Sequence, residues 1–213
     1  MVWIFSVLGV CLMFTCSFFN YRQENNTDSF KSYLKDKSFR EITIELIVVI
    51  LGVTLAINFS EILDKRETNA RMKELLELGC AEVIASYNAN EILLKSYKEK
   101  STSVAEIKYN AQDKTKTLEN ILNNENVMVS LTPVTYVGLC NHIDLVDHFY
   151  SILQEAPEDD KEIATYVAAM DSSFEAIIFL VTNEIAHLEG KQTEKETLQN
   201  YTTYYNEKYI EIE

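Results

Sequence analysis

Lysine and tyrosine side chains are interleaved along residues 95–116, a pattern that suits the binding of an anionic, base-containing ligand. The stretch holds six lysines against three carboxylates. Ammonium groups hold phosphates and tyrosine rings stack on bases, so the pattern predicts a site for a small nucleotide or single-stranded RNA. A solvated polar surface is the simpler interpretation of the same composition. The candidate ligand-binding residues are Lys95, Tyr97, Lys98, Lys100, Lys108 and Tyr109.

Residues that could perform catalysis or bind a metal do not form a recognisable motif. His142 and His148 are six residues apart, about 240° around a helix, so they cannot share a metal from one helix. Asp144 and His148 have the spacing of an ordinary surface pair. The sequence holds no nucleophile beside a recognisable base and no glycine-rich phosphate loop. It therefore predicts a protein that is not an enzyme, with no cofactor and no metal.

The composition restricts the elements that position these residues. Among 213 residues there are only 5 Gly and 2 Pro, too few turn formers for a protein built from many short strands. We therefore expect an all-α protein. Its predicted layout is two N-terminal transmembrane helices, the second continuing into a C-terminal helical bundle.

Residues 1–20 form the first predicted transmembrane helix. No charged side chain occurs from Val2 to Phe19, a length of about 27 Å as a helix, close to a bilayer core of about 30 Å. A cleaved signal peptide is the alternative, but such peptides begin with positive charge and the first basic residue is Arg22. We expect a retained anchor, followed by a linker at residues 21–41.

Residues 42–63 form the second predicted transmembrane helix. The uncharged run from Leu46 to Phe59 is short, and a tilted helix or a thinned bilayer would accommodate it. Small residues spaced four apart let two helices approach, and polar residues in a membrane segment are candidates for an oligomer seam or a pore. A glutamate at this position can instead simply mark the water interface. The candidate packing residues are Glu45, Gly52, Ala56 and Asn58.

Residues 64–213 are predicted to form a soluble helical domain. The second membrane helix should continue to about Lys100, with Met72, Leu76 and Val83 among the apolar residues on one face. Residues 101–129 should be mainly connectors with one helix between Ala111 and Leu122. Thr132-Pro133 should open the next helix. Residues 163–188 have the most regular apolar periodicity and end before Gly190. A final helix should begin at a capping box at residues 193–196.

The net charge of -14 belongs entirely to the distal half of the chain. Residues 1–116 carry 15 basic and 15 acidic side chains, whereas residues 117–213 carry 4 and 18. This balance argues against duplex nucleic acid as a partner and favours the neutral half as the part that approaches a lipid bilayer, although a solubilising acidic surface explains it equally well. The four cysteines lack a disulfide framework, which favours a cytoplasmic domain on an inner, multi-pass membrane protein.

The stretch Phe39-Arg40-Glu41-Ile42 to Asn58-Phe59, followed by a charged helix, resembles segments of uncharacterised bacterial membrane proteins. The layout is also similar to that of compact membrane effectors of prokaryotic antiviral defence, namely the cyclic tetra-adenylate-binding membrane proteins of type III CRISPR loci and the two-helix effectors of retrons. This resemblance implies a homo-oligomeric effector whose soluble domain senses a nucleotide signal, such as a cyclic oligoadenylate, and perturbs the membrane. The alternative is a non-enzymatic membrane-anchored scaffold that binds a protein through its acidic domain.

Overall fold

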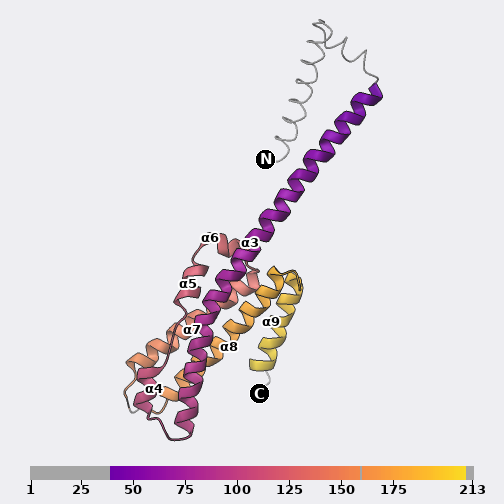
Figure 1. Ribbon diagram of the computed structural model, residues 1–213. Helices are drawn as coiled ribbons and strands as arrows, with labels where there is room; N and C mark the ends of the chain where they lie inside the picture. The colour runs from indigo at the N-terminus through magenta and orange to yellow at the C-terminus, as the bar shows by residue number, and fades with distance from the viewer. Residues whose placement is uncertain (1–38, 159, 210–213) are drawn as a thin grey trace. The chain divides into compact units, whose positions relative to one another are not determined.

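The computed structural model describes the backbone of residues 39–158 and 160–209, and the side chains of residues 45–158 and 160–208. The first predicted membrane helix, residues 1–20, lies outside the described residues, as does nearly all of the linker. The described part contains helices and no strand, which confirms the all-α class (Figure 1). The helices are α3 (Phe39–Lys98), α4 (Val104–Asn110), α5 (Lys116–Leu122), α6 (Glu125–Ser130), α7 (Pro133–Glu155), α8 (Ile163–Leu188) and α9 (Glu194–Tyr209).

Two compact units make up the chain, residues 1–66 and residues 67–213. Helix α3 is a single helix of 60 residues that contains no proline. Its second part belongs to the helical domain of residues 67–213. There the apolar residues predicted to line one face are buried or packed against the core, as Met72, Leu76 and Val83 illustrate with exposures of 5%, 0% and 0%.

Helix α8 lies at the centre of the helical domain. On α3, the Asn69 amide donates to the Leu188 carbonyl at 3.0 Å, and the Tyr87 hydroxyl donates to Glu175 at 2.9 Å. The contact further along α3 is made by an earlier residue of α8, so the two helices are antiparallel.

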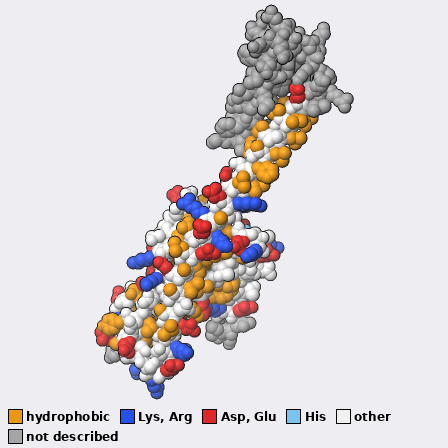
Figure 2. Space-filling model, viewed as in Figure 1, with side chains coloured by type: hydrophobic (Ala, Val, Ile, Leu, Met, Phe, Trp, Pro, Cys, Tyr) orange, Lys and Arg blue, Asp and Glu red, His pale blue; other side chains and the backbone are white. Residues whose placement is uncertain are grey.

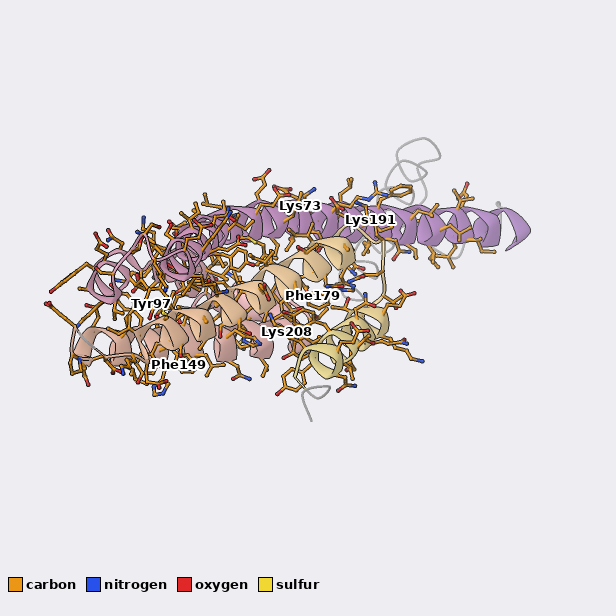
Figure 3. The ribbon with its side chains drawn as sticks, turned by 90° about the horizontal axis from the view of Figure 1, so that it is seen from below. Lys73, Tyr97, Phe149, Phe179, Lys191 and Lys208 are labelled. Atoms are coloured by element: carbon orange, nitrogen blue, oxygen red, sulfur yellow. The ribbon has the colours of Figure 1, made fainter. Side chains whose placement is uncertain are left out.

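Helices α7 and α9 also run antiparallel to α8. The Thr132 backbone N–H at the start of α7 donates to Glu184 at 3.0 Å, and further along α7 a Cβ on Gly138 would lie 2.8 Å from Leu180. On α9, Tyr204 stacks on Phe179 with ring centroids 4.1 Å apart, and Lys208, further along α9, donates to the carbonyl of Ser172, earlier on α8, at 3.4 Å (Figure 3 labels Phe179 and Lys208). Packing of other helices around α8 explains why its apolar periodicity is so regular.

Helix ends follow the sequence signals closely. Ser103 and Glu106 form a capping box that opens α4, and Thr193 and Glu196 form the hydrogen bonds of a second one before α9. Gly190, with φ of 72°, follows the end of α8 as predicted. Two short helices, α4 and α6, occur where only connectors were predicted, and the capping box spelled by residues 103–106 is the signal that would have identified α4.

Candidate functional site

The apolar part of α3 holds no buried residue, and most of its large side chains are exposed. Ile47, Leu51 and Phe59 have exposures of 50%, 56% and 65%, and none of the most apolar window of this helix is buried (Figure 2). Water contact of so much apolar surface is unfavourable by about 25 cal/mol for each Å², so this segment needs a nonpolar environment. The exposed large apolar residues are Ile47, Val48, Ile50, Leu51, Leu55, Phe59, Ile62 and Leu63.

Two described helices, α3 and α8, are long and apolar enough to cross a membrane. They differ in burial, because half of the corresponding window of α8 is buried within the domain. Phe174 and Ile177 of α8 are completely buried, and the same helix carries the buried carboxyl groups of Asp171 and Glu184. Helix α8 therefore serves as the core helix of the domain, which leaves residues 46–63 of α3 as the candidate membrane segment.

The predicted membrane-packing residues all lie on exposed positions of α3. A Cβ on Gly52 would meet no atom within 4 Å, so the spacing from Gly52 to Ala56 leaves an open, flat strip on the helix. Glu45 lies near the same side. Asn58 lies two residues beyond Ala56, about 200° around the helix, and therefore faces away from that strip. Glu45 and Asn58 do not share one face, and self-association through the strip remains a prediction.

Of the predicted ligand-binding residues, those near the end of α3 are mostly exposed. Lys95 and Lys98 occupy its last turn, and Lys100 follows in a turn with a φ of 60°. Tyr97 differs, because its ring packs against the hydrophobic core. The three lysines are thus open to solvent, whereas Tyr97 is partly withdrawn from any ligand.

The other two predicted ligand-binding residues, on α4, have partners within the domain. The Lys108 ammonium donates to the carbonyl of Ala156, and the Tyr109 hydroxyl donates to the carboxylate of Glu158. The hydrogen bond to Glu158 raises the pKa of Tyr109. Both side chains therefore fasten α4 to the end of α7 and the segment that follows it, and the structure does not show them converging with Lys95, Lys98 and Lys100.

A completely buried carboxyl group, Glu184, anchors the start of α7. It accepts the Thr132 backbone N–H at 3.0 Å and the Thr132 hydroxyl at 2.6 Å, while the Thr135 hydroxyl lies 2.9 Å from that of Thr132. Thr132 is the N-cap residue of α7, as predicted, but its side chain bonds to Glu184 and makes no capping hydrogen bond to the helix. Acceptors are favoured at a helix N-terminus. The sequence signal for this residue was its position between Val181 and Leu188 on the apolar face of α8.

A second buried polar group, Asn90, joins α3 to the segment that follows α4. Asn90 is completely buried and pairs with both backbone groups of Gln112, accepting its N–H at 2.8 Å and donating to its carbonyl at 3.0 Å. Asp171 lies next to it. Burial raises the pKa of Asp171 to about 7, although a hydrogen bond from Asn90 acts in the opposite direction. One carboxyl oxygen of Asp171 and the Ser86 hydroxyl are buried without a hydrogen-bond partner.

A polar cluster at the edge of the domain joins three helices around Glu175 of α8. Tyr87 from α3 and Lys208 from α9 both donate to this carboxylate (Figure 3 labels Lys208). Burial would raise the pKa of Glu175, but the two donors outweigh it and lower the pKa. The hydrogen bond to Glu175 raises the pKa of Tyr87 to about 12. The cluster holds α9 in place and presents no free nucleophile.

Within the described part of the chain, no group of three or more His, Cys, Asp or Glu side chains is arranged to hold a metal ion. Comparison with protein-family models, with curated protein sequences and with solved structures found no match to this chain. The functional argument therefore depends on the chemistry of the described surfaces.

Proposed function

We propose that this chain is a membrane-anchored, non-enzymatic protein whose helical domain acts by binding a partner. The observation that carries the proposal is the apolar surface of residues 46–63, none of which is buried and most of which is exposed. As a helix, these 18 residues extend about 27 Å, enough to reach through a hydrocarbon core of about 30 Å with slight thinning.

The proposal places the helical domain in the cytoplasm, next to the inner membrane. Cys80 and Cys140 are both free thiols in the structure, Cys80 buried and Cys140 half-buried. Burial raises the pKa of Cys80, which keeps this thiol protonated and unreactive. Thiols of this kind suit a reducing compartment.

The test is cysteine labelling in a variant that lacks the four native cysteines. Single cysteines at Leu51 or Leu55 report on the membrane segment, and Val137 on α7 and Leu198 on α9, which are similarly exposed, supply matched controls. In open membrane sheets, we expect a water-soluble maleimide to label Val137→Cys and Leu198→Cys readily. Leu51→Cys and Leu55→Cys should react only after detergent dissolves the bilayer, because a thiol in hydrocarbon is not ionised. Equal labelling at all four positions would show that residues 46–63 are not in a membrane.

A second candidate function is the nucleotide-controlled antiviral effector implied by the layout. The exposure of Lys95, Lys98 and Lys100 near the end of α3 favours it, because these three cations are open to an anionic ligand. Reversing all three to Glu should abolish binding of cyclic tetra-adenylate to the full chain and any growth arrest that this ligand triggers. Reversing the exposed lysines Lys114, Lys161 and Lys195 supplies the matched control. Failure of the unmodified chain to bind the nucleotide would remove this candidate.

A further inference from the structure

The side of α3 opposite the domain core carries an exposed apolar strip. It consists of Leu78, Ala81, Ala85 and Ile92, whose spacings of 3, 4 and 7 residues place them on one face. Leu78 and Ile92 are 60% and 66% exposed, and both alanines are exposed. Leu76 and Val83, on the other side of the same helix, are completely buried. We call these four residues the outer strip of α3.

The shape of the outer strip suits another helix. Two large side chains stand at its ends, about 21 Å apart along the helix axis, and two alanines lie between them. Small residues between large ones let a second helix approach closely while the large residues contact it above and below. Figure 2 shows hydrophobic side chains on the face of the domain along which α3 runs.

The charge around the outer strip has one sign. Residues 74–94 contain four glutamates and no Lys, Arg or His. Glu77 and Glu91 lie on one flank, Glu82 on the other, and Glu74 at one end. Within the described residues, Glu74, Glu82 and Glu91 form no ion pair. The fourth glutamate, Glu77, lies 3.7 Å from Lys73, an ammonium group that is also bound to Glu189 (Figure 3 labels Lys73).

Charge argues against a second copy of this chain as the occupant. Copies anchored in one membrane would bring their α3 helices together in parallel, so each glutamate around the strip would meet its own equivalent or a neighbouring glutamate. Like charges at such positions are unfavourable. Cationic side chains on the partner would instead pair with the unpaired carboxylates.

We propose that the outer strip of α3 is the docking surface for a basic amphipathic helix of a partner protein. Its apolar face would cover Leu78, Ala81, Ala85 and Ile92, and its lysines or arginines would reach the flanking glutamates. This proposal rests on the proposed function, because it names the class of partner that the anchored domain binds. Membrane insertion is read separately by the cysteine labelling described above, so failure of one does not imply failure of the other.

The experiment uses the full chain in phosphatidylcholine nanodiscs and a fluorescein-labelled three-heptad helix with Leu at the a and d positions and Lys elsewhere. Fluorescence anisotropy reports binding. Empty nanodiscs and a scrambled peptide of the same composition correct for adsorption to lipid and for attraction by charge alone. We expect the amphipathic helix to bind the protein more tightly than it binds empty nanodiscs, and the scrambled peptide to bind weakly.

Two variants test the apolar and the charged contributions separately. Leu78→Gln with Ile92→Gln should weaken binding by about tenfold or more, because these are the large anchors of the strip. Glu77→Gln, Glu82→Gln and Glu91→Gln together should weaken binding and reduce its dependence on salt. The matched controls are Leu145→Gln with Leu198→Gln, and Glu119→Gln, Glu125→Gln and Glu155→Gln together, all at exposed positions on other helices.

Three outcomes would overturn the proposal. The first is binding no tighter than to empty nanodiscs. The second is equal affinity in the strip variants and their controls. The third is pairing of the full chain in nanodiscs, measured by native mass spectrometry, that Leu78→Gln and Ile92→Gln abolish, because a second copy would then be the occupant. Loss of peptide binding in the strip variants, but not in their controls, would support the proposal, provided that the circular dichroism of the variants matches that of the unmodified chain.

Discussion

Glu184 is the single side chain on which the start of α7 depends most. It accepts both the backbone N–H and the hydroxyl of Thr132, and it is completely buried. A buried donor without an acceptor costs its full desolvation energy. Removing Glu184 would leave two such donors, the backbone N–H and the hydroxyl of Thr132.

We expect Glu184→Ala to lower the free energy of unfolding by about 2–4 kcal/mol, because it leaves two buried donors unsatisfied and opens a cavity. Glu184→Gln keeps the shape and one acceptor oxygen, so its loss should be about 1 kcal/mol. Urea unfolding of the full chain in nanodiscs, followed by circular dichroism, measures both. Equal losses for the two variants would contradict the role of Glu184 as an acceptor.

Asp171 makes the stability of the domain dependent on pH. Burial raises its pKa to about 7, far above the value of about 3.9 for an unfolded chain. The folded state therefore keeps a proton that the unfolded state loses, and stability falls as pH rises from about 4 to about 7. His142 acts oppositely, because burial, together with Lys208, lowers its pKa and stability then falls as pH drops below about 6.5.

We expect Asp171→Asn to remove the loss of stability caused by Asp171, so that the variant gains melting temperature relative to the unmodified chain as pH rises from about 5 to about 8. The contribution of His142 is present in both proteins and cancels in this comparison. Thermal unfolding of the full chain in nanodiscs, followed by far-ultraviolet circular dichroism, gives the two melting temperatures. A difference that does not change with pH would mean that Asp171 is ionised in the folded state.

At the residue scale, the sequence predicted which residues are buried better than it predicted which side chains bond to each other. Helical periodicity placed Met72, Leu76 and Val83 in the core, and all three are buried. The partners of Lys108 and Tyr109, the carbonyl of Ala156 and the carboxylate of Glu158, were not predicted, and they lie 48 and 49 residues further along the chain. Contacts of that sequence separation depend on the packing of α4 against the rest of the domain, which local patterns do not encode.

At the scale of elements, two glycines allow pairs of helices to approach closely. A Cβ on Gly79 of α3 would lie 2.8 Å from Cδ1 of Leu118 and 3.3 Å from its backbone Cα. A Cβ on Gly138 of α7 would lie 2.8 Å from the tip of the Leu180 side chain, with no backbone atom among its closest neighbours. Leu118 belongs to α5, so a side chain at Gly79 pushes against a whole helix, whereas one at Gly138 pushes against a rotatable group.

We expect Gly79→Ala to destabilise the domain by about 1–2 kcal/mol, because displacement of α5 outweighs the helix propensity gained. Gly138→Ala should cost less. Gly52→Ala, where the new Cβ meets no neighbour, should leave the domain unchanged. Hydrogen exchange of the α5 backbone amides measures the displacement, and faster exchange in α5 for Gly138→Ala than for Gly79→Ala would contradict this interpretation.

Several element boundaries were predicted from caps in the sequence, although the capping box at residues 103–106, which opens α4, was not recognised. Pro133 begins α7, Gly190 follows α8, and the capping box of residues 193–196 precedes α9, all as expected. The short helices α4 and α6 were not predicted, because segments of 7 and 6 residues are too brief to display a helical apolar period. The location of α5 next to Gly79 could not be predicted either. It depends on a tertiary contact between α3 and α5, the second helix after it in the chain.

At the scale of the whole molecule, composition alone does not distinguish a membrane helix from a core helix. Both α3 and α8 are long and apolar enough to cross a bilayer, and only their surroundings separate them. Helix α8 is enclosed by other helices of its own domain, whereas residues 46–63 of α3 have no cover within the described part of the chain. Apolar content indicates that a helix must avoid water. Tertiary contacts show whether the rest of the domain covers it, as for α8, or leaves it uncovered, as for residues 46–63.

We expect a fragment of residues 64–213 to be recovered in the soluble fraction as a folded helical protein, although it retains α8. The reason is that other helices of the same unit, residues 67–213, already cover α8. Centrifugation of cell lysates followed by circular dichroism of the supernatant measures this. A folded fragment that stays in the membrane fraction and resists alkaline extraction would show that α8, or another part of the domain, also attaches to lipid.

The central location of α8 also has a consequence for synthesis on the ribosome. The apolar segment of α3 leaves the exit tunnel long before Ile163–Leu188, the helix on which α3, α7 and α9 pack. If residues 46–63 are a membrane segment, as proposed above, their delivery to the membrane can begin while the domain still lacks its central helix. Until α8 is made, the faces of α3, α4 and α7 that pack against it have no partner. Apolar helix faces that are exposed during synthesis are binding sites for chaperones. A ribosome stalled before residue 163 would hold a chain that is ready for membrane insertion and unable to complete its domain.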